Sequence, residues 1–144
     1  MPGYQAPHGG TIPPHVLVTN LRPDIFILDE VKREVVVLEL TCPWDCNTDR
    51  AHSYKEDKYA PLVADLSRNF KAFHFSIEVS ARGQISKSNR ARFKEFAYRC
   101  CADSRKITRS LLTNCSKAAL LASFSIFSAR KEPTWASPRP LIVR

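Results

Sequence analysis

The sequence lacks a long apolar run and is poor in glycine. No stretch approaches the roughly 20 apolar residues of a membrane-spanning helix, so we expect no membrane partner. Three of the 4 glycines lie within residues 1–15 together with four prolines, which predicts a flexible lead-in before the folded domain. Three prolines in residues 131–144 likewise predict an irregular tail. We therefore expect one domain over residues 16–130.

Acidic residues are also scarce. The chain carries 22 Lys and Arg against 14 Asp and Glu, a net charge of +8. An excess of this sign favours a polyanionic partner, nucleic acid before membrane. The N-terminus lacks the basic and apolar regions of a signal peptide, and the 5 cysteines are an odd number. We therefore expect reduced thiols in an intracellular protein, in the cytosol or the nucleus.

A hairpin over residues 22–41 is the clearest element of the chain. Two runs of β-branched, aromatic and other apolar residues, Ile25 to Leu28 and Val35 to Leu38, flank a short charged connection. Asp24 opens the first run and Glu39 closes the second. The start of one antiparallel strand lies beside the end of the next, so these carboxylates should meet at one end of the sheet. Two neighbouring carboxylates repel unless a cation lies between them.

The next periodic segment predicts a helix from about residue 49 to residue 70 that packs on the sheet. Lys55 lies within its apolar face, and Lys58 lies at the edge of that face. A lysine in such a position needs an anion, or else its stem packs while its amine reaches water. The carboxylates expected nearby favour the first interpretation. The apolar face comprises Ala51, Tyr59, Leu62, Leu66 and Phe70.

Alternation over residues 71–79 predicts a half-buried strand. A strand, a helix and another strand in one sheet imply a right-handed crossover, so this strand should run parallel to the second hairpin strand. Residues 16–18 offer a further short edge strand. The predicted fold class is therefore α/β, a small mixed sheet flanked by helices.

Two more helical segments follow the sheet. Residues 86–102 predict a basic helix that packs through Phe93, Phe96 and Ala97. A second helix, from about residue 104 to residue 128, completes a helical C-terminal segment. Its apolar positions are Ile107, Leu111, Leu112, Ala118, Leu121 and Ile126.

The two acids of the hairpin suit a magnesium site. Asp24, Glu39 and the backbone carbonyl of Leu40 offer the hard oxygen ligands that Mg²⁺ prefers. Such a metal lowers the pKa of bound water and neutralises charge that develops on a phosphate. Lys55 would hold the attacking water or stabilise the pentacoordinate phosphate. Tyr59, one turn later, would orient that lysine or contact the nucleic-acid backbone.

In their order along the chain, these residues resemble the PD-(D/E)XK nucleases. The narrower resemblance, over about residues 11–130, is to the restriction-like endonuclease domain at the C-terminus of site-specific non-LTR retrotransposon proteins. It is carried by Arg22-Pro23-Asp24, Glu39-Leu40-Thr41, Lys55-Glu56-Asp57-Lys58-Tyr59 and Ala81-Arg82-Gly83. Thr41 stands where the family usually has a lysine. In this branch the following helix supplies the lysine, and Lys55 or Lys58 would match it.

The resemblance implies a restriction-endonuclease-like fold and a nuclear DNA endonuclease, derived from a retrotransposon protein, that nicks one strand with Mg²⁺, or with Mn²⁺ in its place. It implies no small-molecule cofactor. The alternative is a catalytically inactive DNA-binding or interaction domain that retains the nuclease fold. Phosphate contacts are expected from Arg22, Arg82, Lys87, Arg90 and Arg92.

A zinc site is the rival interpretation of the cysteines. Cys42 and Cys46 are close to His52 in the sequence. Their spacing is not that of a Cys-x₂-Cys pair, and no second pair matches, so we do not predict zinc. Cys42 or Cys115 as a nucleophile lacks a histidine partner that the sequence would place, which favours an idle thiol.

Overall fold

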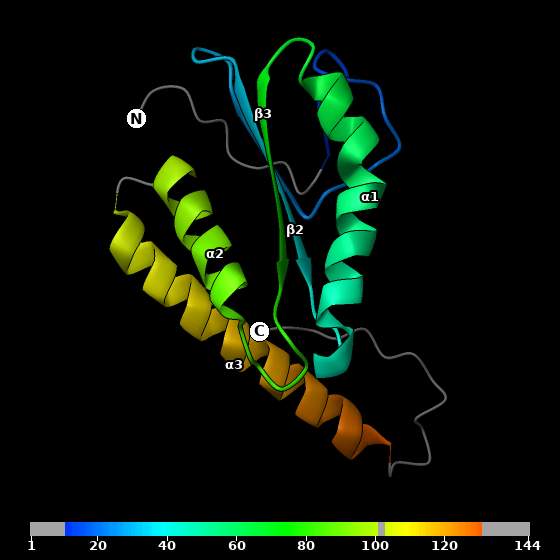
Figure 1. Cartoon of the computed structure of the whole chain (residues 1–144), viewed down its shortest axis with the longest axis vertical. Helices are drawn as coiled ribbons and strands as arrows, with labels where there is room; N and C mark the ends of the chain where they lie inside the picture. The colour runs from blue at the N-terminus through cyan, green and yellow to red at the C-terminus, as the bar shows by residue number, and fades with distance from the viewer. Residues whose placement is uncertain (1–10, 101–102, 131–144) are drawn as a thin grey trace.

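The computed structural model describes residues 11–100 and 103–130. They form a three-layer α/β arrangement in which a three-stranded sheet lies between α1 on one side and α2 with α3 on the other (Figure 1). The coarse fold class predicted from the sequence is confirmed. The expected tail over residues 131–144 and most of the expected lead-in lie outside the described residues. Within that lead-in, Ile12 is buried against the α1 side of the sheet.

The sheet has the order β1-β2-β3, with β2 in the centre. Strands β1 (Ile25–Asp29) and β2 (Glu34–Thr41) form the predicted antiparallel hairpin, in a register that pairs Ile25 with Leu38. Strand β3 (Lys71–Glu78) runs parallel to β2, as the crossover through α1 predicted. The prediction of an edge strand over residues 16–18 is wrong. These residues lie at the end of a turn, in which the Pro13 carbonyl accepts hydrogen bonds from the Val16 and Leu17 amides.

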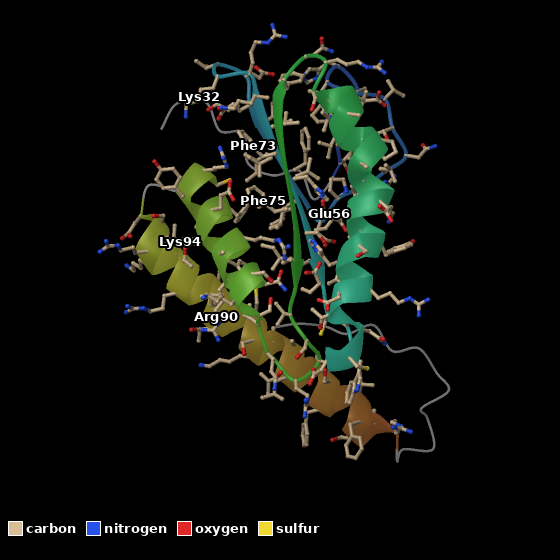
Figure 2. The ribbon with its side chains drawn as sticks, viewed as in Figure 1. Lys32, Glu56, Phe73, Phe75, Arg90 and Lys94 are labelled. Carbon is tan, nitrogen blue, oxygen red and sulfur yellow. The ribbon has the colours of Figure 1, made fainter. Side chains whose placement is uncertain are left out.

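Both faces of the sheet are covered, and the side chains divide by parity. The odd-numbered positions of β2, such as Val35 and Val37, face α1 (Thr48–Leu66) together with Phe26 and Leu28 of β1. On the other face, the odd-numbered positions of β3 meet α2 (Lys87–Cys100). Figure 2 shows Phe73 and Phe75 pointing from β3 towards that helix. The predicted packing residues Phe93, Phe96 and Ala97 of α2 are buried.

Helix α1 ends at Leu66, four residues before the predicted boundary. Phe70 reaches the same core from the loop that follows, and its amide still donates to the Leu66 carbonyl. The apolar stripe was therefore predicted correctly, although the last of its residues is not helical.

Helix α3 (Ser104–Ala129) packs on the rest of the domain as far as Ala119. Leu111, Leu112 and Ala119 meet the α2 side of the sheet, whereas Ala118, Leu121 and Ile126 of the predicted apolar positions are exposed. The helix continues past the end of the sheet, so the part that follows Ala119 has no neighbouring element in the described part of the chain (Figure 1). By its length, and by a mean hydropathy of 1.2 over an 18-residue window, α3 is long and apolar enough to cross a membrane. We assign it to the folded domain because the part that precedes Ala119 packs there.

Candidate active site

Asp24 and Glu39 lie together at the end of the hairpin. The Asp24 amide donates to Oε1 of Glu39 at 3.0 Å, and the Leu40 amide donates to Oδ2 of Asp24 at 2.7 Å. The register produces this arrangement, because pairing Ile25 with Leu38 sets Asp24 beside Glu39. The juxtaposition expected from the sequence is confirmed.

Lys55 of α1 contacts the same carboxylate. Its Nζ lies 2.5 Å from Oε2 of Glu39, and the two side chains are 19% and 2% exposed. Glu39 occupies an odd-numbered position of β2 and so faces α1, where Lys55 lies one turn before the buried Tyr59. Lys58 is exposed instead, with its Nζ 5.1 Å from the centre of the Tyr59 ring. Of the two lysines that the sequence left open, Lys55 is the one in contact with the acids.

Tyr59 anchors the segment that precedes β1. Its hydroxyl donates to the Arg22 carbonyl at 3.2 Å, and its ring is buried. Burial, and then the negative charge of Glu39, raise the pKa of Tyr59 above its usual range. The phenol therefore stays protonated at neutral pH, which suits a hydrogen-bond donor that positions Arg22 and Asp24 rather than a base.

The oxygen atoms of Asp24, Glu39 and Leu40 form a donor set that suits Mg²⁺. Asp24 is exposed, and in an extended strand the Leu40 carbonyl points to the same side as the Leu40 amide, which contacts Asp24. Both oxygens of Glu39 already accept protein donors, one from the Asp24 amide and one from Lys55. Two carboxylates and a carbonyl suit a hydrated Mg²⁺, which keeps several waters. Across residues 11–100 and 103–130, no group of three or more His, Cys, Asp or Glu side chains is arranged to hold a metal.

Thr41, where the family resemblance expects a lysine, lies at the next odd-numbered position of β2. It shares the α1 side of the sheet with Glu39, so Lys55 approaches the acid from the side that a lysine at position 41 would have occupied. Among the described residues, the buried Thr41 hydroxyl has no hydrogen-bond partner. The candidate site thus takes its acids from the hairpin and its lysine from the helix.

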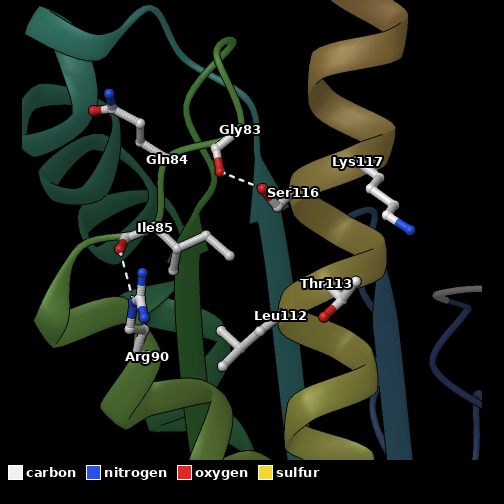
Figure 3. Close-up of a pocket in the computed structure, with 8 residues that line it drawn as sticks. All are labelled: Gly83, Gln84, Ile85, Arg90, Leu112, Thr113, Ser116 and Lys117. Atoms are coloured by element: carbon white, nitrogen blue, oxygen red, sulfur yellow. Dashed lines mark hydrogen bonds between the residues drawn. The ribbon is translucent and has the colours of Figure 1, made fainter.

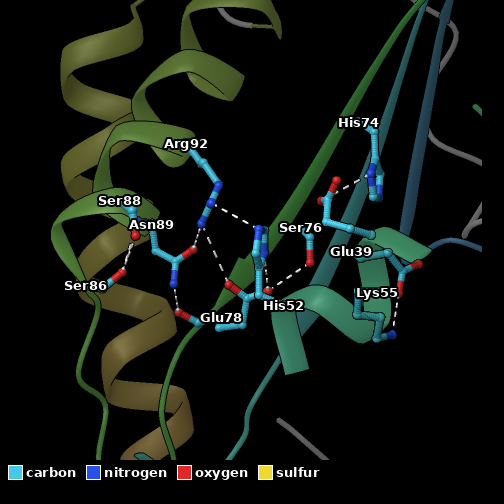
Figure 4. A network of polar contacts seen from close by, with 11 residues as sticks. Glu39, His52, Lys55, His74, Ser76, Glu78, Ser86, Ser88, Asn89 and Arg92 are labelled. Carbon is cyan, nitrogen blue, oxygen red and sulfur yellow. Dashed lines mark hydrogen bonds and ion pairs between the residues drawn. The ribbon is translucent and has the colours of Figure 1, made fainter. Parts of the chain in front are cut away.

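A polar network beside this site was not predicted from the sequence. The buried Glu78 of β3 accepts from Ser76 Oγ at 2.8 Å and lies 3.1 Å from His52 Nδ1 of α1 (Figure 4). Arg92 of α2 lies 3.1 Å from His52 Nε2 and donates to Asn89 at 2.9 Å. The network therefore joins α1, β3 and α2 across the end of the sheet. Its signal in the sequence was the polar alternation His74, Ser76, Glu78, on a strand face that α1 covers.

The basic residues expected to contact phosphates are distributed unevenly. Arg22 and Lys87 are exposed. Arg82 is paired with the carboxylate of Asp45, and Arg92 is engaged in the network of Glu78. The Arg90 Nε donates to the Ile85 carbonyl at 3.1 Å, and the side chain remains exposed. Of these five residues, Arg22 and Lys87 have no recorded side-chain contact among the described residues, and Arg90 is held only through its Nε, so these three are the ones best placed to meet a phosphate.

The cysteines considered for zinc or as nucleophiles, Cys42, Cys46 and Cys115, form no disulfide within the described residues. Cys42 and Cys46 are exposed, and Cys115 is half-buried beside the sheet. Partial desolvation by neighbouring protein atoms raises the pKa of the Cys42 thiol, and burial raises the pKa of the Cys115 thiol; both shifts disfavour the reactive thiolate. His52 contacts Glu78 rather than these cysteines.

Comparisons with protein-family profiles, curated proteins and solved structures find no match to this chain.

Proposed function

We propose that this protein is a Mg²⁺-dependent DNA endonuclease that nicks one strand. In this proposal the protein has a restriction-endonuclease-like fold, is derived from a retrotransposon protein and acts in the nucleus. The observation that supports it best is the 2.5 Å contact between the Lys55 ammonium and a buried carboxylate that also accepts from the Asp24 amide. Two acids that can hold a metal and a lysine beside them are groups that can assist phosphodiester hydrolysis.

Each residue has a distinct role in this proposal. Asp24, Glu39 and the Leu40 carbonyl would hold Mg²⁺, which supplies Lewis-acid neutralisation of the phosphate. Lys55 orients the attacking water and stabilises the negative charge of the pentacoordinate phosphorus. The water oxygen bonds to phosphorus as the P–O3′ bond breaks, leaving a 5′ phosphate and a 3′ hydroxyl. The proton lost by the water balances the one gained by the 3′ oxygen.

DNA as the substrate is supported by the excess of positive charge. With a net charge of +8, the chain attracts polyanions. The exposed Arg22, whose carbonyl accepts from Tyr59, is two residues before Asp24 and would contact a phosphate beside the one that is cleaved. Contacts from arginine and lysine to phosphates bind without reading bases, so we expect little sequence preference from these residues.

Relaxation of supercoiled plasmid tests the proposal. Wild type with Mg²⁺ should convert supercoiled to open-circular DNA, and EDTA should abolish this activity. Asp24→Asn should slow nicking by about 100-fold or more, because it removes a metal-binding charge, while leaving DNA affinity unchanged. Asp57→Asn, which changes an exposed acid of the same type on α1, is the matched control and should nick at the wild-type rate.

A catalytically inactive DNA-binding domain is the second candidate function. It is favoured by one observation: both oxygens of Glu39 are already satisfied within the protein. In that case wild type and Asp24→Asn would show equally little nicking, and both would bind DNA with an affinity that falls as salt rises. Binding that is weak and insensitive to salt would contradict both functions.

A further inference from the structure

A basic groove lies between α2 and α3, on the face of the sheet opposite Lys55 and Glu39. Its cavity has a volume of about 490 Å³. Arg90 and Lys94 line it from α2, and Figure 2 shows both side chains on that helix. The residues from α3 that line this α2–α3 groove include Ser104, Arg105, Thr108 and Arg109.

The charges of the groove are uncompensated within the described residues. Lys94, Arg105 and Arg109 are exposed, and none of them forms an ion pair there. Helix α3 contains no acidic residue from Ser104 to Ala129. Of the two nearest acids in the sequence, Glu95 pairs with Arg99, whereas Asp103 caps α3 by accepting from the Lys106 amide and keeps its negative charge. One carboxylate beside the groove leaves an excess of positive charge among Arg90, Lys94, Arg105 and Arg109. Four cations around one cavity repel one another, and an anionic ligand would relieve that repulsion.

The groove continues towards the loop that follows β3. A second cavity of about 710 Å³ shares Arg90, Leu112 and Thr113 with the first, and Lys117 lies at its far end (Figure 3). From Arg105 to Lys117, α3 rises by about 18 Å, the length of about five phosphates on one strand of a duplex. The lining is therefore a row of cations with the dimensions of a short segment of nucleic-acid backbone.

The local fold keeps this row open. Gly83 has a φ of +76°, and its carbonyl accepts from Ser116 Oγ at 2.5 Å. A Cβ at position 83 would lie 2.6 Å from the Ser116 carbonyl oxygen, so only glycine lets the loop approach α3 so closely. This contact fixes the end of the groove near Lys117.

We infer that the α2–α3 groove binds the phosphodiester backbone of a nucleic acid at a position separate from the hydrolytic site. Arginine, lysine and hydroxyl groups line it, whereas neither cavity has an aromatic residue in its lining on which a base could stack. The groove therefore contacts phosphates and does not select bases. The inference deepens the proposed function, because it gives the same class of substrate a second contact that does not depend on cleavage.

Binding in EDTA tests this inference without any contribution from cleavage. The variant Arg105→Gln/Arg109→Gln removes two cations whose side chains form no hydrogen bond or ion pair within the described residues. Fluorescence anisotropy with a labelled duplex and a labelled single strand, between about 50 and 200 mM KCl, should give a salt slope shallower by about two for whichever strand form occupies the groove. Affinity at about 100 mM KCl should fall tenfold or more.

The matched control is Arg68→Gln/Lys71→Gln. It removes the same charge at exposed positions at the opposite end of β3 from the loop at Gly83, and it should leave the salt slope nearly unchanged. Lys94→Gln is a second, independent groove variant and should make the slope shallower by about one. Circular dichroism of each variant verifies folding.

Equal slopes for wild type and both groove variants would overturn the inference. The inference would also be overturned if Arg105→Gln/Arg109→Gln weakened binding to phosphatidylserine vesicles but left nucleic-acid binding unchanged. Failure of the proposed function is a different result, because absent nicking with an intact groove effect would leave this inference standing.

Discussion

At the scale of single residues, the contact between Glu39 and Lys55 is central to the stability of the candidate site and to the chemistry that we propose for it. A carboxylate that is 2% exposed depends on its partners, and here these are one ammonium and one backbone amide. Removing the ammonium would leave a buried charge with too few donors, whereas removing both charges would not.

A double-mutant cycle tests this dependence. Lys55→Met should lower the free energy of unfolding by about 2 kcal/mol, because Glu39 loses its cation while it remains buried. Adding Glu39→Gln to that variant should recover a large part of the loss, since a neutral amide has no charge to compensate. Urea denaturation followed by circular dichroism gives the three values.

Lys58→Met is the control for this cycle. Its ammonium is exposed and contacts only the Tyr59 ring in the recorded interactions, so the expected loss is no more than about 0.5 kcal/mol. Equal destabilisation by Lys55→Met and Lys58→Met would show that Glu39 does not depend on Lys55.

The sequence was sufficient to bring Asp24, Glu39 and Lys55 together. Hairpin register determines where the two acids meet, and helical spacing puts Lys55 on the packing face. It was not sufficient to choose between Lys55 and Lys58, because both lie near that face and only the position of α1 over β2 separates them. Glu78 was not predicted because the apolar residues of β3 alternate on the opposite strand face, the one that packs on α2. The crossover through a helix nevertheless implied that both faces of the sheet are covered.

At the scale of elements, α1 carries a proline in its interior. Pro61 lies well beyond the first turn of a helix that spans Thr48–Leu66, and it is exposed. It has no amide to donate to the carbonyl four residues before it, and its ring crowds that carbonyl. The packing of Tyr59, Leu62 and Leu66 against the sheet must offset this cost.

Pro61→Ala should therefore stabilise the protein. We expect a gain of about 1 to 2 kcal/mol, which is the helical penalty of proline reduced by the greater freedom of the unfolded chain. Thermal and urea unfolding measure it. Ala60→Gly, at the neighbouring exposed position, should instead lower stability by about 1 kcal/mol. A loss of stability in Pro61→Ala would mean that the native helix requires the proline.

Elements with a strong period were predicted well, and their ends and partners were not. The strands, α1 and α2 follow from alternation and apolar spacing. Residues 16–18 have the composition of a strand, but Pro13 and Pro14 precede them and the chain turns there instead. The apolar period of α3 predicted the helix, but no pattern within a helix states how much of it a neighbour covers.

At the scale of the whole molecule, the sheet separates the proposed hydrolytic site from the proposed phosphate-binding groove. The α1 side holds the acids and Lys55, and the α2–α3 side holds the groove of Arg90, Lys94, Arg105 and Arg109. The overall charge indicated a polyanionic partner, but it did not indicate two locations. Only the packing of α3 against α2 combines the cations of two helices in one cavity, so this surface could not be read from the sequence.

The measurement that tests the central claim most directly is a comparison of plasmid nicking by Lys55→Gln and Lys58→Gln, each verified as folded, with wild type in Mg²⁺. If Asp24, Glu39 and Lys55 form one hydrolytic site, the nicking rate of Lys55→Gln should be lower than that of wild type by about 100-fold or more. Lys58→Gln should retain the wild-type rate. Nicking by Lys55→Gln at the rate of wild type would contradict the account.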